Sequence, residues 1–216
     1  MFNDKYGLTD AVLRGEKTQT RRMAKDKITK EVICKENVIS WRYYQKEKLV
    51  EFLMKNGDIK VSVLPYEVGE VVAVAQRYRD IFENPFTAEQ CLADELPHEL
   101  LRYENGYDNK MFVKPNYMPF KIKIKDIRFE WLQDISNEDC LLEGIFNDKN
   151  GSTIGYPFGI PFYYTFKGAV NKDKKQLHWT FPKEAFEALI NKSSVGGKVK
   201  WEDNPFVFVY SFQLIR

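Results

Sequence analysis

Residues 120–129, FKIKIKDIRF, alternate apolar and charged side chains with the two-residue period of a β-strand. Phe120, Ile122 and Ile124 share one face, and three lysines share the other, which is interpreted as the solvated side of a sheet. The chain closes on a second long strand, NPFVFVYSFQLI, at residues 204–215. These two segments predict a fold organised around a β-sheet.

The remaining patterns are shorter. Strands are predicted at 59–64 and 71–76, and a loop at 104–119. Residues 39–57 are ambiguous and are compatible with a helix. Four further segments carry helix signals: a short helix with Thr9 as its N-cap that ends at Gly15, residues 87–96, the stretch from Ser136 to Gly144, and residues 181–192.

Short strands, helices at the edges and long loops predict an α+β fold, a small mixed β-barrel with flanking short helices. We expect one domain over residues 1–216, with long insertions near 23–57, 79–115 and 146–200. Strand and helix do not alternate regularly, and there is no GxGxxG or P-loop motif, which argues against a doubly wound nucleotide-binding fold. No cofactor is expected.

The cysteines and histidines restrict the chemistry. Cys34, Cys91 and Cys140 are far apart and form no CxxC pair, which argues against a structural zinc site or a disulfide framework and favours the cytoplasm. Only His98 and His178 are available for a zinc enzyme or a Ser-His-Asp hydrolase, so no metal site is expected. No signal peptide is expected, and no apolar run approaches the roughly 18 residues of a membrane span.

The charge distribution is uneven although the net charge is only +2. Residues 17–48 hold ten Lys or Arg against four Asp or Glu, whereas residues 80–108 hold eight acidic residues and one Arg. Two interpretations stay open: these are solvated faces, or they are a basic region for a polyanion beside an acidic insertion that contacts a protein partner.

Four fragments carry a family resemblance, in order along the chain: GEKTQTRR (15–22), YEVGEVVAV (66–74), IRFEWLQDISNEDCLLEGI (127–145) and WEDNPFVFVYSF (201–212). Together they resemble the ASCH domain family, and more narrowly its larger phage and prophage members. The resemblance implies a PUA-like barrel of five or six strands and a tie to RNA. It also implies that the first helix and the Gly15–Arg22 loop flank a central cleft.

Small bacterial members of that family are amidohydrolases that remove the acetyl group from N(4)-acetylcytidine. By resemblance, Thr20 is the nucleophile, Lys17 the proton acceptor and Glu143 the proton donor. The same fragments and the cleft that they imply suggest a set of ligand-binding residues: Gly15, Thr18, Arg21, Arg22, Glu70, Gln76, Tyr78 and Tyr117.

This assignment is chemically coherent. Amide hydrolysis needs a nucleophile, a base and an acid for the leaving amine. Lys17 can accept a proton from Thr20 only if burial or another cation, such as Arg21 or Arg22, lowers its pKa. The alternative is an ordinary solvated turn in which Lys17 and Arg22 are surface charges and Thr20 a turn residue.

The chain also departs from the family pattern. Phage-type members continue the second fragment with Arg-Glu-x-Trp, where this chain has Ala75, Gln76, Arg77 and Tyr78. Three functions are therefore expected, in this order: a module that binds RNA or a (modified) nucleoside, an amidohydrolase acting on acylated cytidine, and a phage accessory protein with a protein partner.

Overall fold

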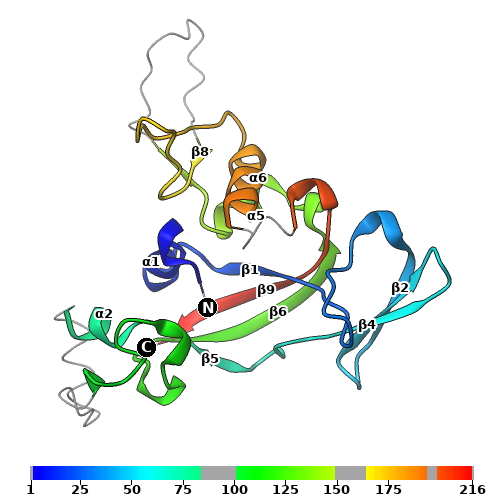
Figure 1. The fold of residues 1–216 in the computed structure, drawn as a ribbon, viewed down its shortest axis with the longest axis horizontal. Helices are drawn as coiled ribbons and strands as arrows, with labels where there is room; N and C mark the ends of the chain where they lie inside the picture. The colour runs from blue at the N-terminus through cyan, green and yellow to red at the C-terminus, as the bar shows by residue number, and fades with distance from the viewer. Residues whose placement is uncertain (1, 84–100, 149–163, 194–198, 216) are drawn as a thin grey trace, which may run out of the picture.

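The computed structural model describes residues 2–83, 101–148, 164–193 and 199–215. The architecture is mixed α+β and mostly strands, with a main sheet that curls into a half-barrel (Figure 1). The predicted α+β class and β-barrel-like character are confirmed at this level. Within the described ranges, no helix combines the length and apolar character needed to cross a bilayer.

The main sheet has the strand order β1-β9-β6-β5, and all its pairs are antiparallel. Its strands are β1 (Gln19–Met23), β5 (Val71–Ala73), β6 (Lys121–Trp131) and β9 (Phe206–Ile215). The alternation predicted for β6 is confirmed, because Ile122 and Ile124 are buried while the neighbouring lysines are exposed.

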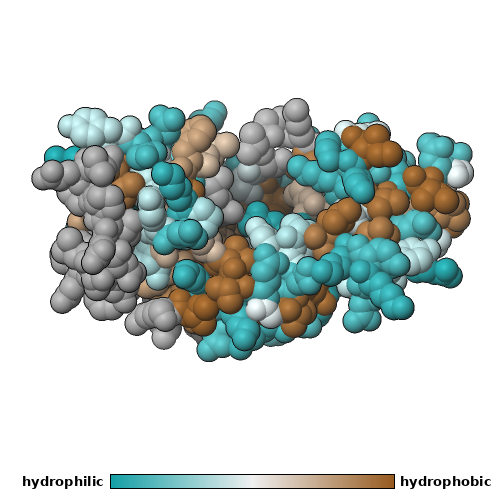
Figure 2. Space-filling view, turned by 90° about the horizontal axis from the view of Figure 1, so that it is seen from below, coloured by the Kyte–Doolittle hydropathy of each residue, from teal (hydrophilic) through white to brown (hydrophobic). Residues whose placement is uncertain are grey.

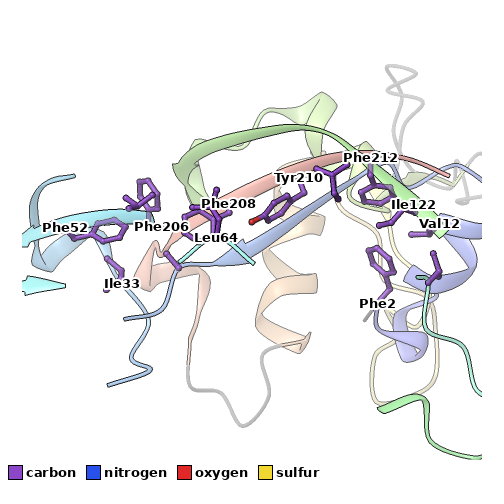
Figure 3. Close-up of a cluster of buried hydrophobic side chains, with 14 of the residues drawn as sticks. Phe2, Val12, Ile33, Phe52, Leu64, Ile122, Phe206, Phe208, Tyr210 and Phe212 are labelled. Carbon is purple, nitrogen blue, oxygen red and sulfur yellow. The ribbon is translucent and has the colours of Figure 1, made fainter. Parts of the chain in front are cut away.

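Strand β9 is buried on both faces. On one face, alternate side chains join a first core with Phe52 and Phe2 (Figure 3): Phe206, Phe208, Tyr210 and Phe212. On the other face, Val207 and Val209 join a second core with helix α6 (Pro182–Ser193). A strand covered on both sides reads as a continuous apolar run, which explains the FVFVYSF sequence.

A second sheet lies at one end of the first (Figure 1). Its antiparallel strands are β2 (Val38–Tyr44), β3 (Leu49–Met54) and β4 (Ile59–Val63). The helix considered for residues 39–57 is wrong, because β2 and β3 form a hairpin there. The apolar run in β3 fits a buried strand as well as a helix, and the cross-strand pair of Trp41 with Phe52 shows that the strand is formed.

This end of the molecule carries exposed apolar side chains, which gather over it in the view of Figure 2. Ile39, Ile59 and Val63 are the most exposed apolar residues of β2 and β4. The view also shows hydrophilic side chains interleaved with them.

The helices are short. Helix α1 (Leu8–Leu13) begins after Gly7, which has φ +65°. The prediction that Thr9 is the N-cap is wrong: a preceding 3₁₀ turn leads into α1, and Thr9 lies inside the helix, where its hydroxyl donates to Asp4 Oδ1 at 2.5 Å. Helix α2 (Tyr78–Glu83) lies where no helix was predicted.

The helix predicted between Ser136 and Gly144 is confirmed as α5 (Asn137–Leu142). The Ser136 hydroxyl accepts a hydrogen bond from the Asp139 amide at 3.1 Å, and Gly144 follows the helix with φ +104°. The helix predicted at residues 181–192 is confirmed as α6. Two short strands, β7 (Phe146–Asn147) and β8 (Tyr164–Thr165), pair beside α6. Single 3₁₀ turns occupy Asp4–Tyr6, Lys35–Asn37, Lys110–Phe112, Pro115–Tyr117, Leu132–Asp134 and Trp201–Asp203.

Two predictions lie wholly or partly outside the described residues. The helix expected at 87–96 is one of them. The acidic stretch 80–108 is described only at its two ends, so its proposed role as a contact for a protein partner stays a prediction.

Candidate functional site

The first half of the GEKTQTRR motif connects α1 to β1, and the second half lies in β1. The loop expected over Gly15–Arg22 is corrected, because Gln19 to Arg22 belong to β1, which pairs with β9. Successive strand side chains point to opposite faces, so Arg21 faces α5 while Thr20 and Arg22 face the first core. Lys17 precedes this edge strand and lies where the two faces meet, since its ammonium contacts both Glu143 and the Phe2 ring.

The guanidinium of Arg21 joins three carboxylates on the helix side. Its side chain is almost fully buried and donates to Glu130 Oε1 at 2.7 and 2.9 Å. It also donates to Asp139 Oδ2 at 2.7 Å and to Glu143 Oε1 at 3.1 Å. Arg128 donates to the same Asp139 oxygen at 2.7 Å. Burial disfavours the charged form of Arg21 and acts to lower its pKa. Attraction to the carboxylates is the stronger effect, so the pKa of Arg21 is raised.

Lys17 and Glu143 form a buried ion pair. The Lys17 side chain is 1% exposed, and its Nζ donates to Glu143 Oε2 at 2.5 Å and to the Glu143 carbonyl at 2.7 Å. Burial lowers the pKa of Lys17, while attraction to Glu143 opposes that shift. A lowered pKa suits a proton acceptor. The contact with a carbonyl at the end of α5 equally suits a lysine that caps a helix C-terminus.

Backbone hydrogen bonds fix Lys17 between α1 and α5. Gly15, with φ +76°, ends α1, and the Lys17 amide donates back to the Ala11 carbonyl at 3.0 Å. The Thr18 amide donates to the Leu142 carbonyl of α5 at 3.1 Å. At Gly144, a Cβ atom would lie 2.9 Å from Leu8 Cδ2 and 3.7 Å from Lys17 Cδ, so this position favours glycine both for its backbone and for its neighbours.

On the opposite face, Thr20 and Arg22 line a small hollow of about 20 Å³. Thr20 is buried and lies opposite Tyr210 in the sheet register. The other walls are mostly apolar: Phe2, Tyr66, Val72, Ala73, Ala75, Ile122 and Ile124. Within the described residues, no hydrogen bond joins the Thr20 hydroxyl to Lys17 or Glu143. The structure thus brings Lys17 and Glu143 together, and Thr20 and Arg22 together, with Phe2 adjoining both pairs.

The other predicted ligand-binding residues are dispersed. Glu70 is exposed, and its carboxylate accepts the Glu67 amide at 2.9 Å in the turn before β5. Gln76 is buried beside a different open cleft of about 430 Å³. Tyr78 and Tyr117 pack in a third, smaller hydrophobic cluster, with ring centroids 6.1 Å apart.

The sequence interpretation missed several site residues. Asp139 lies four residues before Glu143, the spacing that places two side chains on one helix face, and this signal was available. Arg128 and Glu130 lie two residues apart on β6 and therefore share a face. Phe2 has no sequence signal, because its place beside Lys17 depends on how the chain before α1 packs.

Metal and thiol chemistry both depend on the side chains in the part of the chain that the structure describes. No group of three or more His, Cys, Asp or Glu side chains is placed to hold a metal ion there. Cys140 is buried next to the ion network, and burial raises the pKa of its thiol to about 12, so it does not supply a thiolate nucleophile.

Comparisons of this chain with models of known protein families, with curated proteins and with solved structures found no match. The site must therefore be interpreted from its own chemistry. On one face of β1, the Thr20 hydroxyl and the Arg22 guanidinium line a mostly apolar hollow. Before the start of β1, the buried Lys17 is paired with the Glu143 carboxylate.

Proposed function

We propose that this chain is an ASCH-type, PUA-like protein that binds an RNA base or a (modified) nucleoside in the hollow lined by Thr20 and Arg22. The observation that carries the proposal is the place of the Phe2 ring. That ring lines the hollow, packs against Phe212 with centroids 5.7 Å apart, and lies 5.9 Å from the Lys17 ammonium.

A flat ring between an aromatic side chain and a cation is the environment that also suits a nucleobase. Thr20 and Arg22 would supply hydrogen-bonding groups at the edge of such a base. The hollow of about 20 Å³ holds no more than about one water molecule, so a base has to take the place of the Phe2 ring. Phe2 is therefore a competitor of the ligand.

The test is calorimetric titration of cytidine and N(4)-acetylcytidine into the wild type, Phe2→Ala and Thr20→Val. We expect Phe2→Ala to bind more tightly, by roughly tenfold, because the competing ring is absent. Thr20→Val keeps the side-chain shape, loses the hydroxyl and should bind more weakly. Phe112→Ala, which removes an exposed phenylalanine, is the matched control. Equal affinities in all four proteins would contradict the proposal.

The contact of Lys17 with Glu143 favours a second candidate, hydrolysis of an acyl amide on a cytidine-like base. In this reaction Lys17 first passes a proton to Glu143 across their hydrogen bond, and the neutral amine then takes the hydroxyl proton as Thr20 attacks the acyl carbon. Glu143 protonates the leaving amine as the C–N bond breaks, and water then cleaves the Thr20 ester to release the carboxylic acid. Movement of the Phe2 ring would open the space beside both Lys17 and Thr20.

Chromatography of N(4)-acetylcytidine after incubation with protein tests this second candidate. Cytidine should appear with the wild type and not with Thr20→Val, which removes the nucleophile but leaves the Lys17–Glu143 pair intact. Cytidine production that is equal in the two proteins would exclude Thr20 as the nucleophile. No cytidine with the wild type would exclude this reaction and leave the binding proposal to its own titration.

A further inference from the structure

A second, larger groove lies next to the hollow. It has a volume of about 410 Å³, and half-buried rings of Tyr43, Tyr66 and Phe129 line it. The ring centroids of Tyr43 and Phe129 are 4.6 Å apart, and Trp41 continues the row at 6.1 Å from Phe129. Three partly exposed rings around one groove form a platform of the kind on which planar groups stack.

Tyr66 connects this groove to the hollow. It lines both spaces, and its ring packs edge-on against Tyr210, whose backbone lies opposite Thr20 in the sheet. One side chain therefore separates the groove from the hollow that holds Thr20 and Arg22. Two planar groups bound in the two spaces would be neighbours, as successive bases of one strand are.

The rim of the groove is polar and belongs in part to the basic segment. Gln45, Lys48 and Glu67 line it, and Lys48 pairs with Glu67 across the rim where both side chains are half-exposed. Residues 17–48, which include β1, β2 and the turn that leads to Lys48, hold ten Lys or Arg against four Asp or Glu. Lys17 and Arg21 are buried in ion pairs, which leaves eight of these cations to attract a polyanion. An aromatic groove can also dock a proline-rich peptide, but the excess of positive charge favours a polyanion.

We infer that this groove binds a second base of a single-stranded polynucleotide, so that the ligand is an RNA strand and not a free nucleoside. The inference rests on the proposed function, in which the hollow takes the first base. Tyr43, Tyr66 and Phe129 supply stacking, which tolerates any base because every base has a π-face. The basic segment supplies attraction to the phosphates, which weakens as salt rises.

The test is fluorescence anisotropy with a labelled twelve-nucleotide single-stranded RNA, alongside calorimetry with the mononucleoside. We expect Tyr43→Leu and Tyr66→Leu to weaken RNA binding by about tenfold each, the order of one lost base–aromatic stack. Tyr43→Leu should leave mononucleoside binding unchanged. The control is Tyr44→Leu, which removes the adjacent tyrosine on the opposite face of β2.

A crosslinking measurement on the wild-type protein tests the inference without relying on the folding of any variant. RNA that carries 5-iodouridine is irradiated with the wild type, and the adducts are mapped by mass spectrometry. We expect adducts on Tyr43, Tyr66 or Phe129. Adducts found only elsewhere would overturn the inference.

The outcomes separate the two proposals. The groove is overturned as an RNA site if RNA binds no more tightly than the nucleoside, or if the Tyr43→Leu and Tyr44→Leu variants bind RNA equally. Neither result contradicts nucleoside binding in the hollow. RNA binding that falls with Tyr43→Leu but not with Thr20→Val supports the groove and overturns the hollow. Absence of binding to both ligands overturns both, and tight binding of a polyproline peptide in place of RNA overturns the groove as a nucleic-acid site.

Discussion

At the scale of single residues, the almost complete burial of the charged Lys17 side chain is unusual. A lysine is rarely fully buried unless it is paired, and here the pairing carboxylate belongs to Glu143, 126 residues further along the chain. The pair therefore joins the α1–β1 connection to the end of α5. Whatever it contributes to binding or chemistry, it also restrains these two segments.

Replacement of Lys17 by Met tests that restraint. The variant leaves Glu143 buried with Arg21 as its ion-pair partner, so we expect the free energy of unfolding to fall by about 3 kcal/mol, as for other broken buried pairs. Urea denaturation followed by circular dichroism measures it. Lys25→Met, which removes an exposed lysine, is the control and should change stability by less than about 0.5 kcal/mol. Similar losses in the two variants would show that the buried pair adds nothing.

Residue-level prediction from sequence succeeded where the signal was local. The cap at Ser136 and the glycine after α5 follow from short-range chemistry, and the structure contains both. The contact of Lys17 with Glu143 came from the resemblance and not from any periodicity. The intrusion of Phe2 had no local signal, because it is decided by packing between segments far apart in sequence.

At the scale of elements, the connection between β1 and β2 depends on one carboxylate. Asp26 Oδ2 accepts the amides of Ile28 and Thr29 at 3.0 and 2.7 Å, and its Oδ1 accepts the Val61 amide of β4 at 3.1 Å. The Thr29 amide and the other hydrogen bonds lower the pKa of Asp26 to about 2. One side chain thus closes a turn and attaches it to the second sheet.

This arrangement predicts a pH dependence. A carboxyl whose pKa is lowered on folding stabilises the native state above its ordinary pKa near 4, and that contribution is lost as the pH falls toward 2. Asp26→Asn should lower stability by about 1–2 kcal/mol at pH 7 and by less at pH 2. Thermal denaturation at several pH values measures both. A stability difference from the wild type that stays constant between pH 7 and pH 2 would contradict this role, and Asp58→Asn, at an exposed aspartate, is the control.

Elements were predictable where the period of the pattern was unambiguous. The FKIKIK alternation of β6 and the apolar face of α6 identified their structures directly. The LVEFLM run of β3 did not, because five apolar residues around one glutamate are compatible with a buried strand and with a helix alike. The pairing of β3 with β2 and β4 decided the outcome, and this pairing is a tertiary effect.

At the scale of the whole molecule, β9 separates and connects two cores. Its phenylalanines and tyrosine pack on one side with β2–β4, and its valines pack on the other with α5 and α6. Neither core can lose its packing without exposing one face of the same strand. We therefore expect the two cores to unfold together.

The four tryptophans allow this to be measured. Trp41 and Trp131 contact the first core, whereas Trp179 and Trp201 belong to the second. One variant keeps only the first pair, and the other keeps only the second, with phenylalanine at the removed positions. In each variant, the midpoint from tryptophan fluorescence in urea should coincide with that from far-ultraviolet circular dichroism. Midpoints that differ within one variant would show that the cores unfold separately.

The position of β9 in the sheet also bears on how the chain acquires its structure during synthesis. This strand lies between β1 and β6 but follows both in sequence, so neither has its central neighbour until residues 206–215 leave the ribosome. The β2–β3–β4 hairpins are local and can form early, whereas β1 has to wait for a partner nearly the whole chain away. Such non-local pairing slows folding, and it leaves an apolar nascent chain exposed until the last strand arrives.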